Sequence, residues 1–241
     1  MAKIPEKPQD IFEEFVTDFK NLYGDELQAV ILFGSGARGE YVKKRSDINF
    51  LVVLSEEGIQ HLRKSLELIP KWHKRNVSTP LFLTLDYIAS SLDTFPIEFL
   101  IMQQQYEVVY GTDVLGQLKI DKKHLRLQVE HEIKGKLLHL REEFLGTRGE
   151  KRLMSALISR SIPAFASLFA AMLFLKGEEL PPQRSVIIAK AAQVFEFKQE
   201  VFDKLLEVRD KRVSLSKEEL STLFDAYIWE IRKLADLVDK W

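Results

Sequence analysis

The sequence predicts an α/β (α+β) domain with a mixed β-sheet, followed by an all-α helical bundle domain. Up to about residue 120, β-rich apolar runs alternate with helical segments, and this alternation is typical of an α/β layer. Beyond Asp121, every apolar segment has helical spacing. A chain of 241 residues is long enough for two small domains, each with its own core. We therefore predict two domains, 1–120 and 121–241.

The first domain opens with a helix over 11–23, because its apolar residues fall on one helical face. Gly24 follows it in the position of a C-cap glycine. Apolar runs bounded by turn residues predict strands over 29–33, 48–54, 81–85, 96–102 and 107–110. Helices are expected between them, over 56–74 and 86–92.

Five helices are predicted for the second domain, over 125–145, 151–176, 185–195, 199–208 and 216–240. Stretches that contain glycine, proline or short polar residues separate them. Ser216 is a good start for the last helix, because its hydroxyl can cap the backbone and two glutamates follow in the first turn.

The composition excludes several kinds of site. The chain has no cysteine, which excludes disulfides, thiolate zinc sites and cysteine nucleophiles and indicates a reducing compartment. Its 35 basic and 36 acidic residues leave no overall positive field for nucleic acid, which is not expected as a partner. The first residues carry no apolar signal core, and the apolar run over 162–175 is short for a bilayer. We expect a cytoplasmic protein with no membrane association.

The strand predicted over 29–33 ends in Gly34-Ser35-Gly36, and a short helix is expected next. Such a loop offers free backbone N–H groups and a hydroxyl to phosphate oxygens. Gly34 and Gly36 allow the backbone to approach a ligand closely and to adopt positive φ. Arg38 can add charge for a polyphosphate. The segment therefore predicts a phosphate-binding loop.

Three further side chains suit a metal or catalytic site. Asp47 and Asn49 lie on one face at the start of the strand over 48–54. Glu98 has apolar neighbours on both sides in the strand predicted over 96–102, and a carboxylate in such a place is costly unless it is paired or metal-bound. Asp86 is the rival acid, and we expect it to cap the helix that follows it.

The Gly34-Ser35 loop, the spacer and Ser46-Asp47-x-Asn49 together resemble the signature of the polymerase-β-like nucleotidyltransferase superfamily, and of its minimal and kanamycin-type members in particular. The resemblance covers residues 25–112. It implies transfer of a nucleoside monophosphate from a triphosphate, ATP by default, to an acceptor hydroxyl, with Mg²⁺ or Mn²⁺. By the same resemblance, Ser35 and the loop amides hold phosphates, Asp47 binds the metal, and Glu98 is the base or a further ligand. The helical domain would hold the acceptor, a small molecule or a protein, or form a homodimer.

Asn49 is a departure from this signature, which has a second acid there. Magnesium prefers carboxylate and water oxygens, and a two-metal site holds its ions about 4 Å apart. A lost unit charge costs about 4 kcal/mol at ~4 Å and an effective dielectric of ~20. Asn49 remains open as a metal ligand through its carbonyl oxygen, as a hydrogen-bonding group for the nucleotide, or as a relic. The alternative function is a catalytically inactive nucleotide-binding or antitoxin-like interaction module.

A third hypothesis is that the helical domain acts as a ribonuclease. Arg126 and His131 have an Arg-x4-His spacing that resembles the ribonuclease motif of HEPN domains, although this spacing is common by chance.

Overall fold

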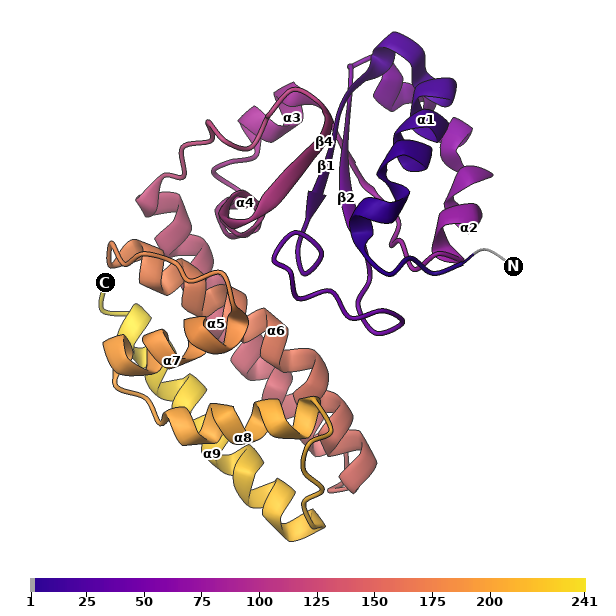
Figure 1. The fold of residues 1–241 in the computed structure, drawn as a ribbon. Helices are drawn as coiled ribbons and strands as arrows, with labels where there is room; N and C mark the ends of the chain where they lie inside the picture. The colour runs from indigo at the N-terminus through magenta and orange to yellow at the C-terminus, as the bar shows by residue number, and fades with distance from the viewer. Residues whose placement is uncertain (1–2) are drawn as a thin grey trace. The chain divides into compact units, whose positions relative to one another are not determined.

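The computed structural model describes residues 3–241. The chain forms two compact units, 1–120 and 121–241. The first contains a β-sheet with helices on both faces, and the second is mostly helical (Figure 1).

The sheet of the first unit is mixed, as predicted. Its described strands are β1 (Leu27–Phe33), β2 (Asn49–Leu54), β3 (Leu81–Leu83) and β4 (Tyr106–Gly111), in the order β3-β2-β1-β4. β1 pairs antiparallel with both β2 and β4, whereas β2 pairs parallel with β3. The two central strands therefore bring the end of β1 and the start of β2 to one edge, since Phe33 lies opposite Asn49.

Helices α1 (Phe12–Tyr23) and α2 (Leu68–His73) cover one face of this sheet, and α3 (Leu85–Ser90) and α4 (Pro96–Gln104) cover the other (Figure 1). Alternate residues of β2 point to the two faces. Phe50 stacks on Phe15 of α1 at a centroid distance of 4.0 Å, whereas Leu51 belongs to the core beneath α3 and α4. Asn49 has the parity of Leu51, so it belongs to the α3–α4 face. Three 3₁₀ segments complete the unit: η1 (Pro8–Ile11), η2 (Gly24–Glu26) and η3 (Gly58–Ser65).

Two of the longer elements predicted for this unit are wrong. The strand predicted over 96–102 is helix α4, which starts at Pro96. Proline suits the first turn of a helix, because the N–H it lacks has no partner there, and a short apolar run does not distinguish a strand from a buried helix. The helix predicted over 56–74 is broken into η3 and α2. Pro70 explains the break, because a continuous helix needs an N–H at that position to bond Leu66.

The second unit consists of α5 (Lys122–Gly146), α6 (Lys151–Leu175), α7 (Arg184–Phe195), α8 (Gln199–Arg209) and α9 (Lys217–Val238). α6 packs against each of the other four. Among the helices of residues 3–241, it is the one long and apolar enough to cross a membrane, but 61% of its most apolar window is buried inside the unit. Its apolar length therefore matches its place at the centre of the bundle.

The predicted start of the last helix is confirmed. The Ser216 hydroxyl accepts from the backbone N–H of Glu219 at 3.1 Å, and the Glu219 carboxylate accepts from the backbone N–H of Ser216 at 2.7 Å. This capping box satisfies two backbone donors at once.

Candidate functional site

The loop that joins β1 to β2 begins with closely packed glycines. Gly34 has φ +77°, and a Cβ atom there would lie 3.3 Å from Nδ2 of Asn49. Gly36 is buried, and a Cβ atom there would lie 3.2 Å from the Leu32 side chain. The short helix expected here is a set of turns instead, in which the Arg38 N–H donates to the Gly34 carbonyl at 3.1 Å. The positive φ predicted from the sequence is confirmed for Gly34, whereas Gly36 does not have positive φ and lacks room for a Cβ atom because of the Leu32 side chain.

Arg38 follows in the same loop with most of its side chain buried. Its Nε atom is buried without a hydrogen-bond partner, and a carboxylate oxygen of Glu40 lies 3.6 Å from it. A buried donor without an acceptor is costly, and an oxyanion in the loop would supply one. The geometry around Arg38 therefore fits a bound phosphate.

Asp47 lies two residues before β2 and is exposed. The backbone on either side of it is fixed by the segment before β3. The Asn76 side chain donates to the carbonyl of Ser46 at 2.9 Å, and the Ile48 N–H donates to the carbonyl of Asn76 at 2.9 Å. A carboxylate on a fixed backbone that is open to solvent is available to a ligand.

Asn49 has a neighbour that the sequence reasoning missed. Its Oδ1 atom accepts a hydrogen bond from the Ser78 hydroxyl at 2.7 Å, and the Ser78 N–H donates to the carbonyl of Ile48 at 3.0 Å. Ser78 precedes β3 much as Asp47 precedes β2. Parallel strands begin at the same edge of a sheet, so a polar residue just before the Leu81–Leu83 run could have been predicted to lie near Asn49.

Glu98 does not lie where it was predicted. It occupies the first turn of α4 and is exposed, so the cost of a buried carboxylate no longer argues for a site role. The cap predicted for Asp86 is also wrong, because the Thr84 hydroxyl caps α3 by accepting from the Tyr87 N–H at 3.1 Å.

The acids near this loop are few. Within residues 3–241, no group of three or more His, Cys, Asp or Glu side chains could hold a metal ion. Asp47 thus belongs to no cluster of three or more such side chains with the geometry of a metal site. This set does not fit a pair of ions in a carboxylate cage. One Mg²⁺ needs only one or two carboxylates when phosphate oxygens and water complete its shell, and Asp47 fits that role.

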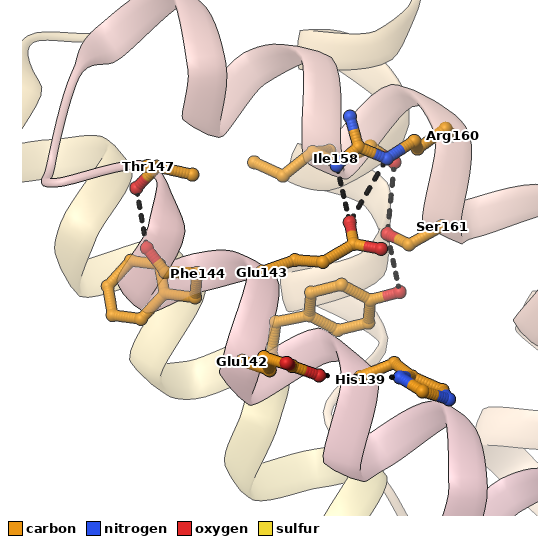
Figure 2. A network of polar contacts seen from close by, with 9 residues as sticks. His139, Glu142, Glu143, Phe144, Thr147, Ile158, Arg160 and Ser161 are labelled. Carbon is orange, nitrogen blue, oxygen red and sulfur yellow. Dashed lines mark hydrogen bonds and ion pairs between the residues drawn. The ribbon is translucent and has the colours of Figure 1, made fainter.

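The second unit has a hollow between α5 and α6, with a volume of about 280 Å³ and both apolar and polar side chains in its lining. Figure 2 shows Arg160 of α6 reaching the Glu143 carboxylate of α5, with a distance of 3.1 Å from Nε. The Ser161 hydroxyl, next along α6, accepts from the Tyr227 phenol at 3.2 Å. His139 also lines this hollow.

Arg126 and His131 both lie on α5, five residues apart and therefore about 140° apart around a 3.6-residue helix. Arg126 is paired with Glu130 at 2.9 Å. The ribonuclease reading gains no support from this arrangement.

Comparison with known proteins adds three findings. Residues 12–103 match the family model described as a nucleotidyltransferase domain. A protein of Methanocaldococcus jannaschii named "putative protein adenylyltransferase" is 43% identical over 47 residues, which are 20% of this chain and 46% of that protein. The chain thus matches less than half the length of this relative.

The third finding concerns the fold. The crystal structure of a spectinomycin adenyltransferase from Enterococcus faecialis, solved with ATP and spectinomycin, superposes with a TM-score of 0.53. The superposition covers 91% of this chain and 99% of that one at 13% sequence identity. At this identity the likeness is one of fold, and it extends over both units.

Proposed function

Because the N-terminal part of this chain belongs to the polymerase-β-like nucleotidyltransferase superfamily, we propose that the protein transfers a nucleoside monophosphate from a nucleoside triphosphate to an acceptor. The observation that carries the proposal is the loop after β1. Its turn begins at Gly34, and it contains the buried Nε of Arg38, which has no hydrogen-bond partner. The Asp47 carboxylate lies where the chain enters β2. A phosphate loop next to a solvent-accessible carboxylate is suited to a triphosphate with its cation.

In this reaction an acceptor hydroxyl oxygen attacks the α-phosphorus of the triphosphate. A new phosphorus–oxygen bond forms as the bond to the β-phosphate oxygen breaks, and pyrophosphate leaves. The hydroxyl proton passes to solvent or to a carboxylate, for which Glu98 stays a prediction. Ser35 and the loop N–H groups would hold the phosphates in line for the attack, because positioning and charge stabilisation supply most of the catalysis in phosphoryl transfer.

A divalent ion, Mg²⁺ or Mn²⁺, would enter with the triphosphate and neutralise part of its charge, with Asp47 as the protein carboxylate. ATP is the proposed nucleotide, since one similar protein is named a putative protein adenylyltransferase and the other a spectinomycin adenyltransferase solved with ATP. The acceptor is proposed as a small molecule or a protein, and these two relatives represent the two classes. A cytoplasmic location and a homodimer stay predictions.

A second function is favoured by a specific contact. Where the family has its second acid, Asn49 is hydrogen-bonded to the neutral Ser78, and this pair adds no negative charge for a second ion. The alternative is a nucleotide-binding or antitoxin-like interaction module that catalyses no reaction.

The test of the proposal uses the full chain and ATP labelled at the α-phosphate, with Mg²⁺ or Mn²⁺, against panels of aminocyclitols and of bacterial proteins. We expect pyrophosphate release and label on an acceptor, both abolished in Asp47→Asn. Asp25→Asn is the matched control, because Asp25 is exposed in η2, away from the strand edge. Nucleotide binding without release of pyrophosphate in any panel would favour the interaction module.

A further inference from the structure

The side chain of Asn49 presents two different groups to its two neighbours. Its Oδ1 atom accepts from the Ser78 hydroxyl at 2.7 Å, whereas its Nδ2 atom lies 3.3 Å from the position of a Cβ on Gly34. The carbonyl oxygen, which would be the metal ligand, thus turns toward β3. The amide N–H₂, which is a pure donor, turns toward the start of the phosphate loop.

Ser78 holds this orientation. Its backbone N–H donates to the carbonyl of Ile48 at 3.0 Å, so its position relative to β2 is fixed by a main-chain bond. Its hydroxyl is the partner of the Asn49 oxygen and also lies 3.3 Å from the Ile48 carbonyl. Asp47, Asn49 and Ser78 all lie at the edge where β2 and the segment before β3 begin.

We propose that Asn49 donates a hydrogen bond to a phosphate oxygen and is not a metal ligand, and that Ser78 is the residue which positions it. The site should therefore bind nucleotide even when no divalent ion is present. The proposal rests on the nucleotide site proposed above and names how that site recognises its ligand. The Asn49 N–H₂ would donate to a phosphate oxygen held at the Gly34–Ser35 turn. A neutral donor does not repel a metal-free triphosphate, whereas a carboxylate at the same position would.

The experiment measures the affinity of ATP by calorimetry, once with excess Mg²⁺ and once with EDTA, for the wild type, Asn49→Asp and Ser78→Ala. Ser90→Ala is the matched control, since the Ser90 hydroxyl bonds only carbonyls of its own helix α3. For the wild type, we expect the affinities with and without the ion to agree within about threefold.

Asn49→Asp should lose about tenfold or more in EDTA, because a hydrogen bond to a charged phosphate is replaced by repulsion, and Mg²⁺ should restore the binding. Ser78→Ala should weaken binding about threefold to tenfold in EDTA, because the amide loses the partner that fixes its orientation. Electron paramagnetic resonance with Mn²⁺ and ATP should count one ion per wild-type chain.

Three results would overturn this inference: wild-type binding that is lost in EDTA, an Asn49→Asp variant that binds metal-free ATP as well as the wild type does, or two Mn²⁺ ions per wild-type complex. The first and third would mean that the Asn49 oxygen faces the ligand. If ATP binds neither the wild type nor any variant, with or without the ion, the proposed function itself is wrong. Labelled acceptor without metal-free binding would retain the proposed function and remove only the role of Asn49.

Discussion

The amide nitrogen of Asn49 packs against Gly34, so closely that a Cβ atom on that glycine would lie 3.3 Å from Nδ2. The first residue of the loop after β1 and the first residue of β2 thus form one contact, although fifteen positions separate them in the sequence. Glycine is therefore suited to position 34 for two reasons: it adopts the positive φ found there, and it has no Cβ atom that would displace the Asn49 amide.

Gly34→Ala should therefore have two effects. The left-handed φ of +77° costs an alanine about 1–2 kcal/mol of folding stability, and the new methyl group displaces the Asn49 amide. We expect lower stability in urea unfolding and weaker stabilisation by ATP. Gly39→Ala is the control, because Gly39 has φ +70° and nothing within 4 Å of its Cβ position. If both variants weaken ATP binding equally, the contact with Asn49 is irrelevant to the ligand.

Gly135→Ala should stabilise the second unit. Gly135 lies inside α5, and nothing lies within 4 Å of its Cβ position. Alanine is favoured over glycine in a helix interior by about 0.5–1 kcal/mol. Thermal unfolding should show a higher midpoint. Gly111→Ala should do the opposite, since a Cβ there would lie 1.9 Å from the carbonyl oxygen of Gln28. A lower midpoint for Gly135→Ala would contradict the open space found around it.

Glu14 links α1 to α2 and should make the first unit sensitive to acid. Hydrogen bonds from Lys71, at 2.9 Å, and from Arg75 hold the pKa of Glu14 below its ordinary value of 4.5. A lowered pKa in the folded state stabilises the fold above the unfolded-state pKa, and this stabilisation is lost as the pH falls through the folded-state pKa. Glu14 is exposed, so the contribution should stay below about 1 kcal/mol.

Glu14→Gln should accordingly lower the free energy of unfolding near neutral pH and have no effect in acid below the titration of Glu14. Urea unfolding across this pH range measures the difference. Glu13→Gln is the matched control on α1, since Glu13 is exposed and makes no ion pair among the described residues. Equal losses for the two variants would show that the effect is one of helix charge and not of the contacts with Lys71 and Arg75.

Tyr227→Phe should destabilise the second unit. The phenol is buried and donates to Ser161 at 3.2 Å, which ties α9 to α6. Loss of this bond costs about 0.5–1.5 kcal/mol, and the Ser161 hydroxyl keeps its own acceptor, the Ile158 carbonyl, at 3.2 Å. Chemical unfolding measures the loss, and Tyr87→Phe at the half-exposed Tyr87 should have no effect. An unchanged stability would mean that the hydrogen bond to Ser161 in the folded state is no more favourable than hydration of the phenol in the unfolded state.

Burial also raises the pKa of Tyr227. The folded state then retains the proton more strongly than the unfolded state does. The corresponding stability is present below the ordinary tyrosine pKa of 10.0 and is lost as the pH rises above it. The alkaline limb of the stability curve should be shallower in Tyr227→Phe than in the wild type.

The local pattern predicted most of the elements. β1 and β2 are long apolar runs bounded by turn residues, and the five helices of the second unit have sustained helical spacing with clear breaks. Where the pattern was short, it was ambiguous. The apolar run after Pro96 suited a strand or a helix equally. The interpretation of Glu98 as a buried acid depended on the strand assignment.

The sequence by itself determined the loop composition, the spacing from Gly34 to Asp47, and the absence of a second acid at Asn49, because these are local facts about residue type and order. Only the tertiary structure decided which side chain lies beside Asn49 and which way its amide points. Ser78 reaches Asn49 across a parallel pair of strands, although the two residues are twenty-nine positions apart in the sequence. Such a contact depends on strand order and register, which are set by how two cores pack on opposite faces of the sheet and not by any local pattern.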